Sequence, residues 1–75
     1  MRLSDLKIKE RAEIIDINCD SILKNRLHSF GIMKGAIVTI EELTLTKSTI
    51  EIKINHSKIA LRLSEAEKIG VKYAS

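Results

Sequence analysis

Apolar and polar residues alternate with a period of two along much of the chain, which is typical of β-strands with one buried face. The pattern is clearest in 36–43, 49–55 and 58–63. In the second stretch every other residue from 50 to 54 is isoleucine, with Glu and Lys between the isoleucines. The three stretches therefore predict half-buried antiparallel strands.

A further strand is predicted near the N-terminus, where the alternation is imperfect. Ala12 and Ile14 share one face of this strand, and Ile15 and Ile17 share the other. Two adjacent isoleucines interrupt the period, so we expect the strand to contain a β-bulge.

The spacing becomes helical in 20–30. Leu23, Leu27 and Phe30 fall on one face of a helix there, which indicates a narrow apolar stripe. Asp20 directly precedes this stripe and is positioned to cap the N-terminus of the helix.

Three shorter elements complete the pattern. A turn of helix is expected at 3–7. A short helix is predicted over 64–70, because Ser64 and Glu67 have the spacing of a capping box. Residues 71–73 can then close the sheet as a last strand.

Together these elements predict a mainly β protein with one inserted helix. Their number and order favour an SH3-like five-stranded antiparallel β-barrel, and a chain of 75 residues suits a single domain over 1–75. Phe30 and Tyr73 are the only aromatic residues in the sequence. We therefore expect an aliphatic core, with both rings in structural positions.

Gly31 and Gly35 lie four residues apart between apolar residues, and three roles are conceivable. A phosphate-binding loop would precede a helix, whereas Gly31 follows one. A membrane-helix contact would need an apolar stretch of about 20 residues around the glycines, which the sequence lacks. The structural role fits best. Gly31 ends the helix in a left-handed conformation with Ile32 against Leu27, and Gly35 allows a tight turn into the next strand.

Charge and cysteine content narrow the function classes. Thirteen Lys and Arg against ten Asp and Glu give a net charge of +3, which is too small and too evenly spread to indicate nucleic acid binding. Cys19 is the only cysteine, so no intramolecular disulfide can form. No signal-peptide-like or membrane-spanning apolar segment is visible. The sequence therefore predicts a cytoplasmic protein without direct membrane insertion.

Cys19, His28 and His56 are the side chains best suited to bind a transition metal, but they are scattered rather than closely paired. We expect no resident metal or cofactor, and a weak or transient metal contact stays open. Glu41 and Glu42 alternate across a strand, so their carboxylates are expected on opposite faces. No catalytic residue is predicted, and the chain is not expected to be an enzyme.

A small regulatory or nucleic-acid-binding SH3-like domain is an alternative. Lys47, Lys53, Lys58 and Arg62 are expected to gather on the outer face of one hairpin, although Glu51 interrupts them. Exposed aromatic rings that could stack on single-stranded bases are not expected. Nucleic acid is therefore an unlikely partner class.

The middle and C-terminal stretches carry a family resemblance. A helix ending in "LHSFGIMKG", then strands, then "IALRLSEAEKIGV" resembles the FeoA family of ferrous iron transport accessory proteins, as does "LSDLK" followed by "ERAEI" near the start. The resemblance covers roughly residues 3–71. It implies an SH3-like barrel with an inserted helix in a bacterial or archaeal cytosol. It also implies a partner, the FeoB-type membrane iron transporter with a cytosolic GTPase domain, whose uptake or GTP turnover the protein would modulate.

The resemblance also leaves alternatives open. FeoA-like domains occur fused to metal-dependent repressors, but no helix-turn-helix accompanies this chain. The family commonly has Pro-Gly where this chain has Ile8 and Lys9, and proline where it has Lys34. A Gly-x-Pro turn of the family is replaced at about 47–49, and His56 stands where the family often has glycine. These departures concern loops, so they leave the barrel expected and the loop shapes open.

The segment after the helix is where we expect part of a partner contact. Ile32 has a structural role against Leu27, whereas Met33 has none. An unbranched thioether on a loop suits an adaptable contact surface. Met33, with its neighbours Ile32 and Lys34, is therefore the predicted partner-binding site. The sequence does not indicate the oligomeric state.

Overall fold

The computed structural model describes residues 1–44 and 46–74. The elements in chain order are η1 (Leu3–Asp5), β1 (Arg11–Ile17), α1 (Ser21–Ser29), β2 (Ile37–Thr44), β3 (Thr49–Ile54), β4 (Ser57–Arg62), α2 (Leu63–Ala66) and β5 (Ile69–Tyr73). No helix in this part of the chain is long and apolar enough to cross a membrane.

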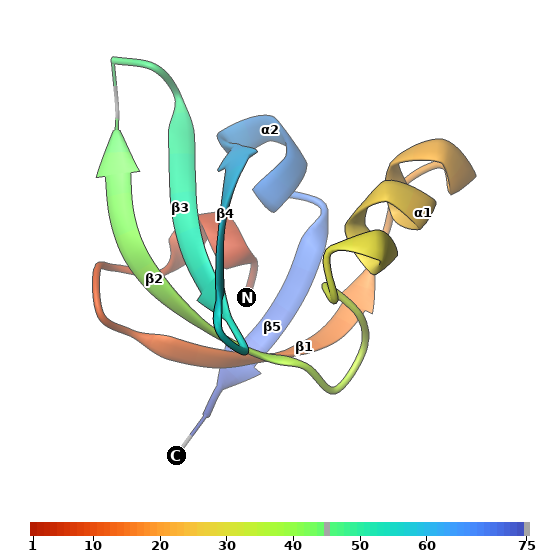
Figure 1. The fold of residues 1–75 in the computed structure, drawn as a ribbon, viewed down its shortest axis with the longest axis horizontal. Coiled ribbons are helices and arrows are strands. Elements are labelled where there is room, and N and C mark those ends of the chain that lie inside the picture. Colours follow the sequence, from red (N-terminus) through yellow and green to blue (C-terminus); the bar gives the residue numbers. More distant parts are fainter. Residues whose placement is uncertain (45, 75) are drawn as a thin grey trace.

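The five antiparallel strands form one sheet in the order β4-β3-β2-β1-β5. The sheet is strongly curved, and α2 connects its two edge strands, β4 and β5 (Figure 1). Its concave side encloses the core. The mainly β, SH3-like five-stranded antiparallel architecture predicted from the strand pattern is confirmed.

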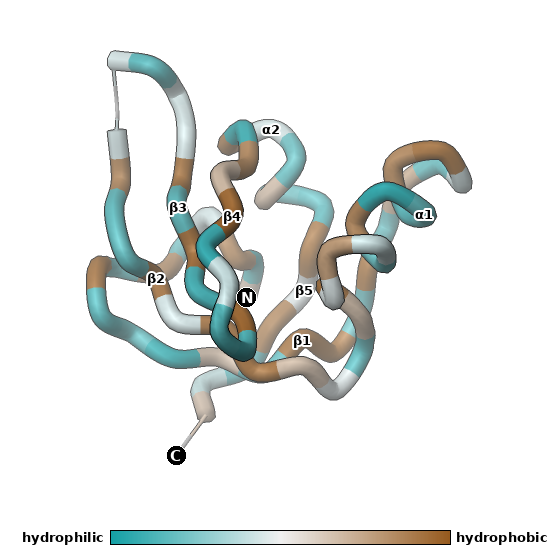
Figure 2. Tube along the Cα trace, viewed as in Figure 1, coloured by the Kyte–Doolittle hydropathy of each residue, from teal (hydrophilic) through white to brown (hydrophobic). Residues whose placement is uncertain are grey.

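The core is aliphatic, as the composition predicts. All three isoleucines of β3 are buried, and brown apolar positions alternate with polar ones along this strand (Figure 2). Leu3 and Leu6, in and beside η1, are also buried and belong to the core. The expectation for the two aromatic residues is wrong. Phe30 is 40% exposed and Tyr73 is 60% exposed, because Phe30 stands at the end of α1 and Tyr73 at the end of an edge strand.

Two β-bulges shape the sheet. The bulge predicted in β1 is confirmed between Ile14 and Asp16, and it lets Ile17 return to the core side. A second bulge, in β2 between Ile40 and Glu42, corrects the expectation for the adjacent glutamates. Because the bulge adds a residue, Glu41 and Glu42 both lie outside the core instead of pointing to opposite faces.

The two α-helices differ in how well the sequence predicts them. Asp20 caps α1 as expected, since its side chain accepts a hydrogen bond from the Leu23 N–H at 2.8 Å. α2 is shorter than predicted and begins earlier. Its capping carboxylate is Glu65, which accepts the Arg62 N–H at 3.0 Å, so the predicted box of Ser64 and Glu67 is wrong.

The shift of α2 has a simple cause. Leu63 packs against the core as the first residue of α2, so the strand pattern ends one residue before this leucine. The earlier helix also lets β5 begin at Ile69 rather than at Val71.

Gly31 ends α1 with the geometry expected for it. Its φ is +88°, the Ile32 N–H donates to the Leu27 carbonyl at 3.0 Å, and the Gly31 N–H donates to the His28 carbonyl at 2.9 Å. These two bonds define a Schellman motif, and both Leu27 and Ile32 are fully buried. The helix therefore ends by turning an apolar residue into the core.

The next turn also depends on a left-handed residue. Gly35 has a φ of +92°, and the Ala36 N–H donates to the Met33 carbonyl at 3.0 Å. Lys34 and Gly35 are thus the central residues of a β-turn, and a positive φ at the second of these is what a type II turn requires.

Among residues 1–44 and 46–74, three residues other than glycine also have positive φ: Lys9 at 73°, Ser48 at 51° and Asn55 at 56°. Lys9 lies in a turn closed by the Glu10 N–H, which donates to the Lys7 carbonyl at 3.1 Å. Ile8 and Lys9 therefore occupy the two central positions for which type II turns favour Pro and Gly. The unusual composition of this loop leaves backbone strain at Lys9.

We expect Gly31→Val to lower the free energy of unfolding by about 1 kcal/mol or more, because a Cβ is unfavourable at this φ. An added Cβ would meet its nearest neighbours only at 3.8 Å, so the backbone conformation and not crowding causes the loss. The corresponding fall in melting temperature is about 4–8 °C for a domain of this size. Gly31→Asn is the milder control. Equal stabilities of the wild type and both variants would show that Gly31 is not left-handed.

We expect the opposite result at the first turn. Lys9→Gly should raise the free energy of unfolding by up to about 1 kcal/mol, since the relief of left-handed strain exceeds the added entropy of the unfolded chain. Ile8→Pro in the same chain should add to the gain. Lys7→Gly is the matched control, because Lys7 has no positive φ, and this variant should be destabilised. Urea denaturation of the three variants measures the difference, and destabilisation by Lys9→Gly would contradict it.

Candidate partner-binding surface

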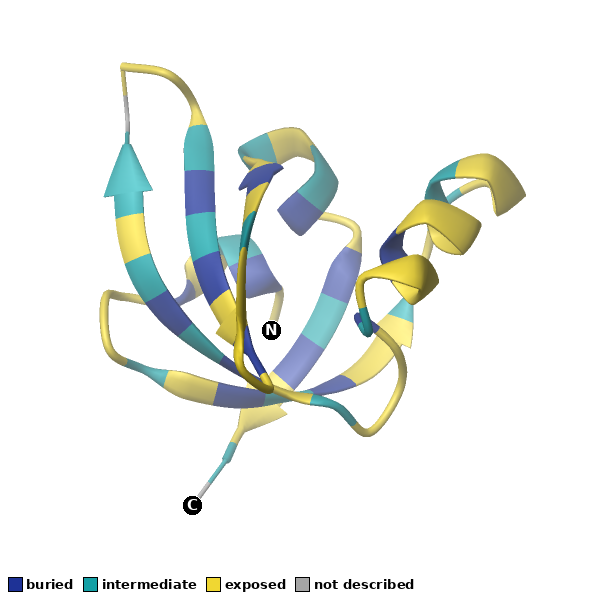
Figure 3. Ribbon diagram, viewed as in Figure 1, coloured by how far each residue is buried: buried dark blue, intermediate teal, exposed yellow. Residues whose placement is uncertain are grey.

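Helix α1 projects from the barrel between β1 and β2 (Figure 1). Leu27 is the only one of its nine residues that is buried, and most of the helix is drawn as exposed in Figure 3. Leu23 is partly buried against the core. A narrow apolar stripe thus attaches α1 to the barrel and leaves most of its surface accessible.

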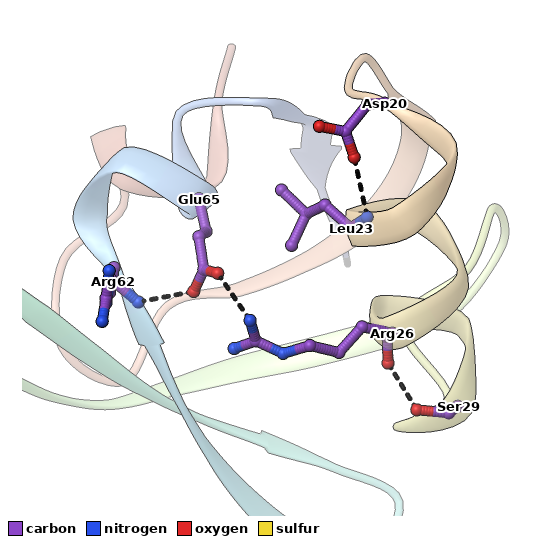
Figure 4. Close-up of polar contacts among 6 residues, drawn as sticks. All are labelled: Asp20, Leu23, Arg26, Ser29, Arg62 and Glu65. Atoms are coloured by element: carbon purple, nitrogen blue, oxygen red, sulfur yellow. Dashed lines mark hydrogen bonds and ion pairs between the residues drawn. The ribbon is translucent and has the colours of Figure 1, made fainter.

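A single carboxylate links α1 to α2. The Arg26 Nη1 lies 3.1 Å from the Glu65 Oε2, and the other carboxylate oxygen accepts the Arg62 N–H (Figure 4). The Glu65 side chain is 12% exposed and the Arg26 side chain is 53% exposed, so solvent screens the arginine end of this pair more than the carboxylate end. The same glutamate therefore caps one helix and helps to orient the other.

The turn after α1 contains the predicted partner-binding residues, which differ in their exposure to solvent. Met33 is 44% exposed and Lys34 is exposed, so both side chains are accessible. Ile32 is fully buried and belongs to the core. The accessible surface of this segment therefore consists of Met33 and Lys34, while Ile32 holds the turn in place.

A groove of about 340 Å³ lies beside this turn, between α1 and β1. Ile15, Asp16 and Ile17 of β1 line one part of it, and Lys24 and His28 of α1 with Lys34 of the turn line the rest. Apolar, acidic and basic side chains are thus combined in a small area. Such a mixture is typical of a polypeptide contact surface rather than of an enclosed small-molecule site.

The sequence interpretation missed two exposed apolar residues, one on α1 and one at its C-terminal end. Ile22 on α1 is 83% exposed, and Phe30 at the end of α1 is 40% exposed. Ile22 stands at the edge of the apolar stripe, and helical spacing alone assigns such residues to the buried side. The shortness of the helix could have indicated the exposure of Ile22. A helix of nine residues that is held to the core by a narrow stripe cannot bury the residues at the edge of that stripe.

The four basic residues expected in one cluster form two separate pairs. Lys53 and Lys58 lie directly opposite each other in β3 and β4. Arg62 lies opposite Thr49, farther along the same hairpin, and lines another groove together with Lys47.

The three possible metal ligands do not converge. His28 and His56 are exposed on different elements, and Cys19 is partly buried against the core. Within 1–44 and 46–74, no three His, Cys, Asp or Glu side chains are placed to hold a metal ion together.

The Tyr73 hydroxyl at the end of β5 lies close to the carboxylate of Glu10. The negative charge of Glu10 is the main cause that raises the pKa of the Tyr73 hydroxyl, with smaller contributions from burial and from a hydrogen bond to Glu10. A raised pKa favours the neutral phenol over the reactive phenolate.

Known proteins resemble this chain in both sequence and fold. A Helicobacter pylori (strain J99) protein, named as an Fe(2+) transport protein A, is 43% identical over 67 residues, which are 87% of this chain and 86% of that protein. The solution structure of FeoA from Chlorobium tepidum superposes with a TM-score of 0.93 at 29% identity, over 100% of this chain and 71% of that one.

A crystal structure of Stenotrophomonas maltophilia FeoA, described as a prokaryotic SH3 domain protein and complexed with zinc, has a TM-score of 0.83. It covers 96% of this chain and 89% of that chain at 24% identity, which supports the fold. The family model of the FeoA domain matches residues 1–73. By sequence and by fold, this chain belongs to the FeoA family.

Proposed function

We propose that this protein is a non-enzymatic accessory module of ferrous iron uptake that acts on the cytosolic side of the membrane. Its partner is the cytosolic part of an FeoB-type transporter, and its binding modulates iron uptake or GTP turnover. The family membership supports the assignment to iron uptake, since relatives at 37–43% identity are named as Fe(2+) transport proteins.

The accessible surface beside α1 is the observation that carries the binding role. Met33 and Lys34 stand on a turn that is fixed from both ends, by the buried Ile32 and by the hydrogen bond from Gly35 to the Ile14 carbonyl at 2.7 Å. A rigid support of this kind reduces the entropy that a binding surface loses on association. Met33 supplies polarizable apolar contact, and Lys34 supplies charge at its border.

The projecting helix offers further accessible side chains. Ile22 and Phe30 add exposed apolar area on α1, and Lys24 and His28 line the groove toward β1. Exposed apolar side chains bordered by charged ones are typical of protein–protein contact sites. Comparing the rate of GTP turnover by the transporter domain with and without this protein would give the direction of regulation.

We expect Met33→Asp to weaken binding to the transporter's cytosolic domain at least tenfold, because a carboxylate would lose its hydration in an apolar contact. Its melting temperature should stay within about 2 °C of the wild type, since Met33 lies outside the core. A pull-down followed by calorimetric titration against the purified domain measures the affinity.

Ile8→Asp is the matched control for that experiment. Ile8 is 49% exposed, close to the value for Met33, and lies in the turn before β1. The control should bind as the wild type does. Normal binding by a folded Met33→Asp protein would move the contact elsewhere, and equal loss of folding and binding would show that Met33 has a structural role.

The second expectation concerns metal. We expect the purified protein, dialysed against a chelator at neutral pH, to retain much less than one equivalent of iron or zinc, because Cys19, His28 and His56 do not converge. Elemental analysis by mass spectrometry measures the content. One equivalent that survives dialysis would contradict the expectation, and alanine substitutions at the three residues would then locate the site.

A further inference from the structure

The sheet register places three basic residues in one row on its outer face. Arg11 of β1 lies opposite Thr39 of β2, Thr39 opposite Lys53 of β3, and Lys53 opposite Lys58 of β4. The three basic residues are exposed, and Thr39 is partly so. The row, which we call the basic row (Arg11, Thr39, Lys53 and Lys58), therefore crosses four neighbouring strands.

The pairing of Lys53 with Lys58 is unfavourable for the fold. Like charges directly opposite each other in an antiparallel pair destabilise it, whereas opposite charges stabilise it. The same sheet contains the favourable arrangement between β1 and β5, where the Lys72 Nζ lies 3.9 Å from the Glu13 Oε1. Local arrangements that cost stability occur most often where function requires them.

Ion pairs within the described chain compensate the basic row only weakly. Among the residues that the structure describes, Lys58 has one ion-pair partner, the Glu41 Oε1 at 3.9 Å, at a distance and exposure where such pairs contribute little. Among the described residues, neither Arg11 nor Lys53 forms an ion pair. The basic row thus presents positive charge to whatever approaches this face.

An acidic row runs parallel to the basic one. Glu42 of β2 lies opposite Glu51 of β3, and Ala60 of β4 follows in the same row. A broad negative surface approaching this face would meet these glutamates as well as the basic row. The charge pattern therefore suits a narrow anionic ligand that follows one row across the strands.

We propose that the basic row binds an acidic segment of a partner polypeptide, laid across the strands in an extended conformation. Four neighbouring strands span about 14 Å, and five extended residues cover the same distance. Carboxylates on alternate residues can then reach successive basic side chains, and the Thr39 hydroxyl can donate to one of them. A charged bilayer would face the acidic row, and single-stranded nucleic acid would lack aromatic stacking, since the row contains no aromatic residue.

The test uses a synthetic hexaglutamate peptide and the full chain, so it does not depend on the transporter. Titration followed by amide NMR shifts should give the largest changes at the residues of the basic row, and the affinity should fall several-fold between 50 and about 200 mM salt. Hexaglutamine is the neutral peptide control. Shift changes centred elsewhere on the chain would overturn the proposal.

Substitutions separate position from net charge. Lys53→Gln with Lys58→Gln should weaken hexaglutamate binding at least fivefold, while the melting temperature stays the same or rises because the repulsion is removed. Lys47→Gln with Lys68→Gln removes the same charge from the turn before β3 and from the segment between α2 and β5, and should leave the affinity within twofold. An equal loss in both double variants would show nonspecific attraction and overturn the proposal.

Competing ligands provide the last comparison. A six-nucleotide oligothymidylate and vesicles with 30% phosphatidylserine, at matched charge concentration, should bind the wild type more weakly than hexaglutamate does. Tighter binding of either one, lost in the Lys53→Gln and Lys58→Gln protein, would assign the basic row to nucleic acid or to lipid and overturn the polypeptide assignment.

Discussion

The apolar face of a five-stranded sheet must be buried, and the described part of this chain has neither a second sheet nor a long helix to cover it. The sheet therefore curves around its own side chains, and the chain's other elements follow from that constraint. The bulges in β1 and β2 increase the bending, η1 adds Leu3 and Leu6 to the core, and α2 connects the two edge strands. Because the curved sheet encloses its own core, α1 is needed only for the side of the barrel that Leu27 covers.

Much of the fold could be predicted from the sequence, because burial on one side of a strand produces an alternation of apolar and polar residues. The isoleucines of β3 and the interrupted alternation of β1 predicted a strand and a bulge correctly. The bulge in β2 could not be predicted in this way, since Glu41 and Glu42 are both polar and fit either face. The start of α2 was also misplaced, because Ser64 and Glu67 imitate the spacing that Arg62 and Glu65 satisfy in the structure.

Only part of the candidate site could be predicted, because the exposure of its apolar side chains depends on the tertiary structure. Gly31 required a particular backbone conformation, so its neighbourhood could be worked out from covalent geometry and the Leu27–Ile32 contact. The exposure of Ile22 and Phe30 depends instead on how far α1 stands from the barrel, which no local pattern encodes. The basic row likewise depends on the register of four strands, because its members are up to 47 residues apart in the sequence.

Lys58 has a second consequence because β4 has a strand neighbour on one side only within the described chain. The outer backbone groups of an edge strand can pair with a strand from another molecule, and a charged lysine on such an edge discourages that addition. A sequence that lost this charge would acquire a more adhesive edge, and self-association at high concentration would follow. Solubility therefore gives selection a reason to keep a cation at this position, even in a relative whose partner has no acidic segment.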